Sequence, residues 1–337
     1  MIIPVKTQNG LYNIYLERGG LSKVGEYFNL NRKVLVVTDS GVPAQYAQTV
    51  ANCCKESLIV TVKMGEPSKN IETFTHLLSC LVENGFTRTD CVVAVGGGVV
   101  GDLSGFVASA FMRGIDFYNI PTTILSQVDS SIGGKTAIDF MGYKNIVGAF
   151  YPPKGVLIDP DTLKTLPKRQ QSNGLAEALK MAATSDATLF DIFENDDIDA
   201  NIDMIIERSL RIKKDVVEKD EKEAGLRKIL NFGHTLAHAI ESANQLETYY
   251  HGECVGMGML PMCAPAVRAR LLPILKKLGL PTETSYTIND LLEACRHDKK
   301  TSGDKITIVY VPEIGRVELR TMHFAEYETL VKEGLSQ

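Results

Sequence analysis

The chain has 337 residues, of which 44% are hydrophobic and 23% are charged. This length favours two domains, and the apolar content is sufficient for a packed core in each. The formal net charge is -5, so no global positive field attracts a nucleic-acid backbone or an anionic membrane surface. We therefore predict neither as a partner, and we expect any anionic ligand to be bound by a local cluster of cations.

The cysteine content and the N-terminal segment favour a mature cytoplasmic protein. The seven cysteines are an odd number and form no C-x-x-C pair, which favours a reducing compartment. The N-terminal segment alternates polar and apolar residues and does not resemble a signal peptide. No stretch of the sequence approaches the ~20 apolar residues that a membrane-spanning helix requires.

Two hydrophobic patterns divide the chain. Short β-branched runs at 33–38, 58–63, 91–95 and 117–120 alternate with polar stretches of helical character, which predicts parallel βαβ units. Beyond Leu163 the periodicity is mainly helical, in segments such as 173–184, 203–218 and 230–243. Segments 305–311 and 316–320 predict a late β-hairpin.

The predicted domain boundary lies near Pro152 and Pro153, where the pattern changes. Proline disfavours helical structure in the residue before it, so the pair is typical of a connection between elements. We predict an α/β domain at 1–155 and a mainly α-helical domain at 156–337, with a cleft between them.

A glycine-rich segment, GGGVVGD at 96–102, follows one of the β-branched runs. Glycine permits a tight turn and close approach of a ligand, and the N–H groups that begin a helix attract phosphate. A dinucleotide pyrophosphate is the natural ligand of such a turn. The spacing matches neither G-x-G-x-x-G nor the Walker pattern, so a strand-to-helix turn that merely needs positive φ is the alternative.

A second polar and glycine-bearing stretch follows within fifty residues. It contains Thr122, Thr123, Gln127, Asp129, the segment SSIGGK ending at Lys135, and the pair Lys144-Asn145. Such a stretch is poor in core residues and rich in donors for phosphate and hydroxyl oxygens. The two segments together predict a polyhydroxylated, phosphorylated ligand.

Three of the six histidines, His234, His238 and His251, fall within eighteen residues. His234 and His238 share one face if their segment is helical. Glu177 stands in an apolar helical context and could add a carboxylate. Two imidazoles and one carboxylate with an open position form a known type of catalytic zinc site.

Other interpretations of the histidines stay open at this point. From spacing alone, His238 is as good a metal ligand as His234. A pair of helix histidines satisfied by hydrogen bonds is the structural alternative. The segment HTLAH at 234–238 lacks the H-E-x-x-H pattern, so a zinc peptidase is not indicated.

Five blocks, in order along nearly the whole chain, resemble the 3-dehydroquinate synthase family of sugar-phosphate cyclases. They are GGGVVGD (96–102), PTTILSQVDSSIGGK (121–135), Lys144-Asn145, LNFGH (230–234) and HGE (251–253). The resemblance implies an N-terminal Rossmann-like NAD-binding domain and an α-helical C-terminal metal-binding domain. It also implies an active site between them and a homodimer.

The resemblance assigns zinc, with cobalt as a substitute, to Glu177, His234 and His251, and makes His238 a catalytic residue that contacts the substrate. Around the substrate phosphate it places Lys135, Asn145, His238, one of Lys299 and Lys300, and Arg113 of the partner subunit. Around the carboxylate it places Lys213, Arg227 and Asn231, with Glu223 near the metal and the hydroxyls.

The resemblance also implies an NAD site in the N-terminal domain, with Asp39 near the adenosine. The other NAD residues are Glu66, Lys69, Gly98, Val99, Val100, Gly101, Asp102, Thr122, Thr123, Asp129, Lys135, Lys144, Thr162, Leu163, Lys164 and Thr165. Two departures from the family pattern stand at Met64, which leaves one ribose contact open, and at Met181-Ala182.

The implied activity is a phosphate-eliminating lyase of the shikimate pathway, in aromatic amino acid biosynthesis. It would convert 3-deoxy-D-arabino-heptulosonate 7-phosphate into 3-dehydroquinate by transient oxidation with NAD, elimination, reduction and aldol closure. The alternatives are a cyclase acting on sedoheptulose 7-phosphate or glucose 6-phosphate, a metal-dependent polyol dehydrogenase, and a non-catalytic binding protein. Lys213, Arg227 and Asn231 favour the sugar acid, because buried cations without an anionic partner would be costly.

Overall fold

The computed structural model describes all residues except 9, 224, 244–247, 297–300, 303 and 336–337. The chain divides into two compact units, Met1–Leu166 and Pro167–Gln337. The first unit ends later than the boundary predicted at residue 155, because the strand Gly155–Ile158 pairs with two other strands of that unit. Lys299 and Lys300 lie outside the described residues.

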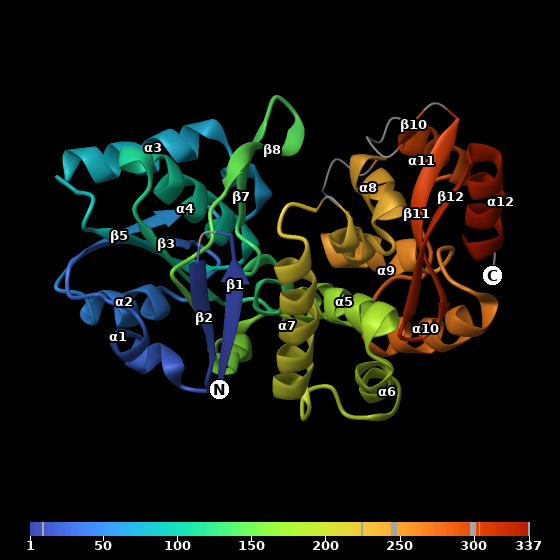
Figure 1. The fold of residues 1–337 in the computed structure, drawn as a ribbon, viewed down its shortest axis with the longest axis horizontal. Coiled ribbons are helices and arrows are strands. Elements are labelled where there is room, and N and C mark those ends of the chain that lie inside the picture. Colours follow the sequence, from blue (N-terminus) through green and yellow to red (C-terminus); the bar gives the residue numbers. More distant parts are fainter. Residues whose placement is uncertain (9, 224, 244–247, 297–300, 303, 336–337) are drawn as a thin grey trace. The chain divides into compact units, whose positions relative to one another are not determined.

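The first unit is built on a seven-stranded sheet in the order β1-β2-β9-β6-β5-β3-β4 (Figure 1). Strands β1 and β2 are antiparallel, and all pairs from β2 to β4 are parallel. The strands are β1 (Ile2–Thr7), β2 (Gly10–Leu16), β3 (Lys33–Asp39), β4 (Glu56–Val62), β5 (Cys91–Gly96), β6 (Asp116–Pro121) and β9 (Gly155–Ile158). A separate antiparallel pair is formed by β7 (Lys135–Phe140) and β8 (Tyr143–Phe150).

Helices cover both faces of this sheet (Figure 1). They are α1 (Val24–Tyr27), α2 (Ala44–Asn52), α3 (Ile71–Glu83) and α4 (Gly98–Ala110). The shorter helical segments are η1 (Gly20–Lys23), η2 (Glu66–Ser68), η3 (Phe111–Arg113), η4 (Ser126–Ser130) and η5 (Pro160–Thr165).

The central strands explain the near-continuous apolar runs of the sequence. Leu35 and Val92 pack with α3 and α4 on one face of the sheet, whereas Val36 and Val93 pack with α1 and α2 on the other. Successive side chains of a strand point to opposite faces, so a sheet covered on both sides needs apolar residues at every position. The predicted Rossmann-like fold of the N-terminal region is confirmed.

The second unit is mostly helical. Its helices are α5 (Lys168–Ser185), α6 (Ala187–Asn195), α7 (Ile202–Lys219), η6 (Leu226–Asn231), α8 (His234–Ala243), α9 (His251–Met259), α10 (Pro265–Lys277), α11 (Ile288–Arg296) and α12 (Phe324–Leu335). The strands β10 (Thr301–Ser302), β11 (Lys305–Glu313) and β12 (Arg316–His323) form an antiparallel sheet. Strands β11 and β12 confirm the predicted late hairpin, and the helical character of this half is confirmed as well.

Helix α5 forms the centre of the second unit, since every residue from Asn173 to Thr184 is buried. It packs against α6, α7 and α9. A helix surrounded in this way is expected to be apolar on all sides, yet α5 buries the charged residues Glu177 and Lys180. In the part of the chain that the structure describes, no helix has the length and apolar character needed to cross a membrane.

Candidate functional site

Three side chains converge in the second unit: Glu177 from the middle of α5, and His234 and His251, which are the first residues of α8 and α9. One ligand atom from each lies within 4.8 Å of the others. Glu177 Oε1 is 3.8 Å from Nε2 of His234 and 3.5 Å from Nε2 of His251. This arrangement suits a small cation between the three groups.

The hydrogen-bond partner of Nδ1 in each imidazole determines which nitrogen can bind a metal. His234 Nδ1 lies 3.1 Å from the carbonyl oxygen of Phe232, and His251 Nδ1 lies 3.1 Å from Oε1 of Glu241. Both oxygens can only accept, so each Nδ1 carries a hydrogen and donates it. In the neutral form of each ring, the Nε2 lone pair is then directed to the shared centre, as in metal-ligating histidines.

The carboxylate of Glu177 gives an independent test of whether a metal fits. Glu177 is 1% exposed, and within the described chain its Oε1 atom is buried without a hydrogen-bond partner. Burying an anionic oxygen is costly unless a donor or a cation compensates it. A divalent cation between Glu177, His234 and His251 would supply that compensation, so the residues fit the implied metal.

Burial and neighbouring charges shift the pKa values of the three converging residues in different directions. Burial by itself would raise the pKa of Glu177, but Lys180 and the two histidines hold it well below its usual value. Burial and the charge of Lys180 hold the pKa of His234 well below its usual range. Burial also disfavours the imidazolium of His251, but Glu177 and Glu241 outweigh it and raise the pKa of His251 to about 10.

Lys180 is a site residue that the sequence interpretation did not select. Its ammonium group pairs with Oε2 of Glu177, and both side chains are 1% exposed. The signal was present in the sequence, because a lysine three residues after a glutamate lies on the same face of a helix and the surrounding residues are alanine and leucine. A buried charge in such a context needs a partner.

Glycines set the close approach of the helices that carry the two histidines. A Cβ atom on Gly258 of α9 would lie 2.1 Å from the carbonyl oxygen of Gly233, the residue before His234. Gly233 itself has a φ of 78°, in the left-handed region that favours glycine. A Cβ atom on Gly252, beside His251, would lie 1.9 Å from the carbonyl oxygen of Asn173. Larger residues at Gly252 or Gly258 would therefore move a histidine.

His238 is not one of the three converging residues. It lies one turn beyond His234 on α8, with the two ring centroids 5.6 Å apart, and its side chain is exposed. Spacing alone had left His234 and His238 equivalent. The geometry separates them, because only His234 directs a ring nitrogen to Glu177.

The residues expected at a substrate carboxylate occupy α7 and η6, which pack together. Lys213 and Arg227 are buried, and Arg227 donates to the carbonyl oxygen of Glu221 at 2.5 Å. Asn231 Nδ2 donates to Oε1 of Glu223 at 2.7 Å, so these two predicted residues are in direct contact.

In the first unit, three predicted residues surround the buried Lys69, which was itself predicted. Lys69 Nζ lies 2.6 Å from Oδ2 of Asp102 and 4.0 Å from Oε1 of Glu66, and it donates to Oδ1 of Asn145. Burial opposes the charge of Lys69, but Asp102 and Glu66 outweigh it and raise the Lys69 pKa. Burial raises the pKa of Glu66 and of Asp102.

The glycines at and around the start of α4 are required for space. None of Gly96, Gly97, Gly98 and Gly101 has positive φ, so the alternative of a turn that only needs positive φ is wrong. A Cβ atom added to Gly97 would lie 3.1 Å from Thr123 Cγ2, and one added to Gly98 would lie 3.0 Å from Ser130 Oγ. The start of α4, with Val99 and Val100 in its first turn, has no side-chain cap, which leaves its N–H groups suited to an anion.

The predicted NAD segments share one edge of the sheet. Asp39 ends β3, residues 66–69 follow β4, residues 98–102 follow β5, Thr122 and Thr123 follow β6, and residues 162–165 follow β9. The carboxyl ends of parallel strands meet at one edge, where open α/β sheets bind their ligands. Burial raises the pKa of Asp39, although its carboxylate accepts from the backbone N–H of Gly41 at 2.7 Å.

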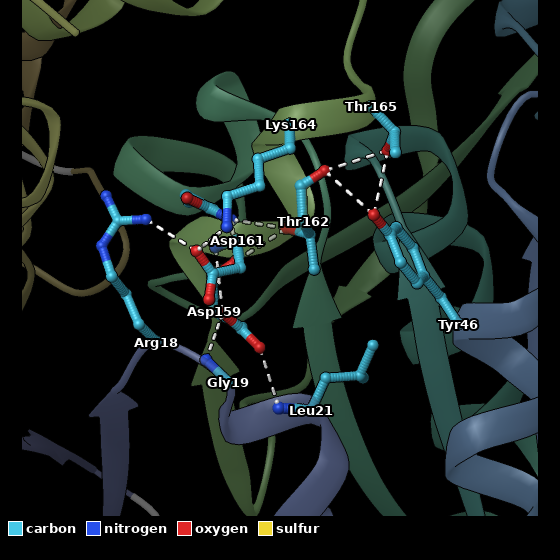
Figure 2. Close-up of polar contacts among 10 residues, drawn as sticks. Arg18, Gly19, Leu21, Tyr46, Asp159, Asp161, Thr162, Lys164 and Thr165 are labelled. Atoms are coloured by element: carbon cyan, nitrogen blue, oxygen red, sulfur yellow. Dashed lines mark hydrogen bonds and ion pairs between the residues drawn. The ribbon is translucent and has the colours of Figure 1, made fainter.

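Figure 2 shows how η5, which contains Thr162, Leu163, Lys164 and Thr165, is anchored. The buried carboxylate of Asp159 accepts from the backbone N–H groups of Gly19, Leu21 and Asp161, each at 3.0 Å. Tyr46 forms a 3.0 Å hydrogen bond with Thr165 Oγ1.

Gln127, also buried, joins this segment to the end of β6. Its Nε2 atom donates to the carbonyl oxygen of Pro121 at 3.1 Å and to Thr162 Oγ1 at 3.1 Å. Two of the predicted NAD segments are therefore linked through one side chain.

Four other predicted residues lie on surface or turn positions of the first unit. Lys135 begins β7, Lys144 is in β8, and both are exposed. Asp129 is half-buried in η4. Arg113 is exposed at the end of η3 with a φ of 71°.

Fold and site together define the class of protein. A Rossmann-like α/β unit followed by a mainly helical unit is the architecture of the dehydroquinate synthase-like cyclases. The family models of the 3-dehydroquinate synthase N-terminal and C-terminal domains match residues 59–173 and 174–301. The chain belongs to the 3-dehydroquinate synthase family.

Individual relatives agree with this assignment. A 3-dehydroquinate synthase of Streptococcus suis is 39% identical, over 97% of this chain and 98% of the relative. A solved 2-deoxy-scyllo-inosose synthase, complexed with carbaglucose-6-phosphate, NAD+ and Co2+, has a TM-score of 0.87 at 25% identity and covers 99% of this chain and 100% of its own. The 2-epi-5-epi-valiolone synthase of Streptomyces hygroscopicus, with NAD+ and Zn2+ bound, has a TM-score of 0.86 at 26% identity, over 96% of both chains.

Proposed function

We propose that the protein converts 3-deoxy-D-arabino-heptulosonate 7-phosphate into 3-dehydroquinate and phosphate, as a carbon–oxygen lyase of the shikimate pathway. The observation that carries this proposal is the convergence of Glu177, His234 and His251 in a chain that the two family models cover from residue 59 to 301. The curated relative of 39% identity has the same activity in its name.

We propose NAD and a divalent metal, zinc or cobalt, as the cofactors. When bound, NAD accepts and returns a hydride, and the metal polarises the reacting oxygen. One carboxylate and two imidazoles are a ligand set that suits zinc. The residues at the carboxyl edge of the parallel sheet would hold NAD: the cluster of Glu66, Lys69 and Asp102, the start of α4, and the η5 segment.

The substrate carboxylate is the feature that separates the proposed substrate from sedoheptulose 7-phosphate and glucose 6-phosphate. We assign its binding to Lys213, Arg227 and Asn231. Lys213 and Arg227 are buried, and their positive charges suit an anionic ligand. The planar guanidinium of Arg227 suits a carboxylate better than a point charge does.

We assign the substrate phosphate to Lys135, Asn145 and His238, together with Lys299 or Lys300. Their cationic and amide groups would hold the phosphate in place until it leaves, and His238 would act in proton transfer. Glu223 and Asn231, which contact each other, would orient the substrate hydroxyls. In this assignment the chain positions the substrate and stabilises charge.

The homodimer is also a proposal. Arg113 ends an exposed turn of the first unit in which Met112 and Arg113 both have positive φ. We propose that this turn extends to the partner subunit, where Arg113 would meet the substrate phosphate. We further propose a cytoplasmic location, since all seven cysteines are free thiols and free thiols persist in a reducing compartment.

A comparison of three substrates tests the proposal. The protein loaded with Zn2+ and NAD+ is incubated with the heptulosonate phosphate, sedoheptulose 7-phosphate or glucose 6-phosphate, and the cyclic products are identified by mass spectrometry. We expect 3-dehydroquinate from the first substrate alone. A product from sedoheptulose 7-phosphate, with none from the heptulosonate phosphate, would assign the protein to a sister activity.

A further inference from the structure

One face of α5 is directed to the beginning of α9. Arg169, Asn173 and Glu177 are four residues apart, so their side chains form a row along one face of the helix. Each contacts a residue between 248 and 253, the segment that surrounds His251. Glu177 belongs to the proposed metal site, whereas Arg169 and Asn173 have no role in the function proposed above.

Arg169 clamps the first turn of α9 through Glu253. Its Nε and Nη2 atoms donate to the two oxygens of Glu253 at 2.7 and 2.8 Å. Nη2 also donates to the carbonyl oxygen of Thr248 at 2.5 Å. The guanidinium carbon lies 4.2 Å from the ring centroid of Tyr250. A bidentate pair with a stacked aromatic ring permits little movement of either partner.

Glu253 links Arg169 to Tyr250, the residue before His251. Its Oε2 atom accepts from the backbone N–H of Tyr250 at 2.8 Å, and its side chain is 7% exposed. The carboxylate thus satisfies one of the unpaired N–H groups at the start of the helix. Arg169, Glu253 and Tyr250 together fix the position at which α9 begins.

Asn173 holds the residue after His251. Its Oδ1 atom accepts from the backbone N–H of Gly252 at 2.6 Å. The absence of a side chain on Gly252 allows this approach, since a Cβ atom would lie 1.9 Å from the carbonyl oxygen of Asn173. His251 is therefore held on both sides along the chain by residues of α5.

We propose that Arg169 and Asn173 are positioning residues of the metal centre. They fix the first turn of α9 on the helix that carries Glu177, and so hold Nε2 of His251 opposite Oε1 of Glu177. The inference rests on the proposed metal site. Outer residues that orient ligands typically change metal affinity by roughly 10- to 100-fold when they are removed.

Neither residue acts as a ligand in this proposal. The guanidinium of Arg169 has no acceptor atom, and Oδ1 of Asn173 already accepts from Gly252. Their removal should therefore weaken the metal through the position of His251. The readouts are the affinity for Co2+, measured by competition with a chelator, and the visible spectrum of bound Co2+, which reports the ligand geometry.

Arg270 provides a matched control within the same unit. Its Nε and Nη2 atoms donate to both oxygens of Glu194 at 2.9 and 2.7 Å, and its guanidinium carbon lies 5.0 Å from the ring centroid of Phe190. This clamp joins α10 to α6 and touches none of the three metal-binding residues. Arg270→Met removes the same kind of contact as Arg169→Met.

We expect Arg169→Met and Asn173→Ala to bind Co2+ roughly 10- to 100-fold more weakly than the unchanged protein, with an altered spectrum. Asn173→Asp, which retains an acceptor oxygen, should bind more tightly than Asn173→Ala. Arg270→Met should keep the affinity and the spectrum of the unchanged protein. If Arg169→Met does not fold, the comparison of Asn173→Ala with Asn173→Asp carries the test.

Two results would overturn the proposal. One is unchanged Co2+ affinity in Arg169→Met and Asn173→Ala, or a loss no larger than that of Arg270→Met. The other is failure of the unchanged protein to bind Co2+ or Zn2+, which would contradict the proposed metal site itself. The two failures are distinct, because the first leaves the unchanged protein able to bind metal.

Discussion

Oε1 of Glu241 accepts a hydrogen bond from Nδ1 of His251, at 3.1 Å, so that one turn of α8 orients the imidazole at the start of α9. Glu241 is buried, and a carboxylate in this position fixes the ring and raises the basicity of the opposite nitrogen. Glu241 would therefore support the proposed metal centre, although it is not one of the three converging residues.

Replacing Glu241 tests this relationship. Glu241→Ala removes the acceptor, and we expect the affinity for Zn2+ to fall roughly 10- to 100-fold. Glu241→Gln keeps a neutral oxygen that can accept from Nδ1, so its loss should be smaller. Titration calorimetry with Zn2+ gives both values, and equal affinity in Glu241→Ala and the unchanged protein would show that Glu241 does not orient His251.

Lys180→Met should destabilise the protein mainly when metal is absent. Lys180 and Glu177 form a pair in which both side chains are 1% exposed, and breaking a buried pair by removing one partner costs about 3–5 kcal/mol. Urea unfolding followed by circular dichroism measures the loss. Added Zn2+ should recover part of it, because a cation bound to Glu177 replaces the missing charge. A variant as stable as the unchanged protein without metal would contradict this account.

Asp159→Asn should destabilise the first unit and weaken NAD binding. The buried carboxylate accepts hydrogen bonds from three backbone N–H groups. Asparagine has an NH2 group in place of one oxygen, so at least one of these N–H groups would face a donor, and the free energy of unfolding should fall by about 1–3 kcal/mol. Urea unfolding and titration with NAD+ measure the two effects.

Asp161→Asn is the control for that substitution. Asp161 pairs with Arg18 and Lys164, whose side chains are 43% and 71% exposed (Figure 2). Exposed pairs contribute only about 0–1 kcal/mol, so the unfolding free energy should change little. A larger loss in Asp161→Asn than in Asp159→Asn would contradict the anchoring role of Asp159.

Gly258→Ala should displace the segment that carries His234. The added methyl group would lie 2.1 Å from the carbonyl oxygen of Gly233, and overpacking of this kind costs about 1–3 kcal/mol or more. We expect lower thermal stability and weaker Zn2+ binding. Gly256→Ala on the same helix is the control, since its methyl group would lie 3.2 Å from the flexible end of Leu275 and no nearer than 3.9 Å to Leu280. Equal effects of the two substitutions would contradict the prediction.

Local sequence patterns predicted most of the fold. The β-branched run at 91–95 is continuous because β5 is covered on both faces. The hairpin of β11 and β12 was predicted from two β-like runs on either side of the turn residues 312–315. The first unit extends past the predicted boundary, because Pro152 and Pro153 lie in the connection between β8 and β9, two strands of that unit. No pattern in residues 155–158 shows that β9 pairs with β2 and β6.

The proposed metal centre was harder to predict from the sequence. Spacing could select His234, His238 and His251 as a group, but the choice among them depends on which ring nitrogen reaches Glu177. Of the partners of the outer ring nitrogens, Glu241 reaches His251 through the packing of α8 on α9, whereas the Phe232 carbonyl stands only two residues before His234. Contacts between residues distant in the chain, such as Arg169 with Glu253, leave no periodic signal.

The most direct test of the proposed function measures phosphate release and NADH absorbance together during turnover of the heptulosonate phosphate. The account predicts steady release of phosphate with no accumulation of NADH, because the hydride is returned within each cycle. It also predicts that a chelator abolishes the release and that added Zn2+ restores it. Accumulation of NADH without release of phosphate would contradict the proposed function and indicate a dehydrogenase.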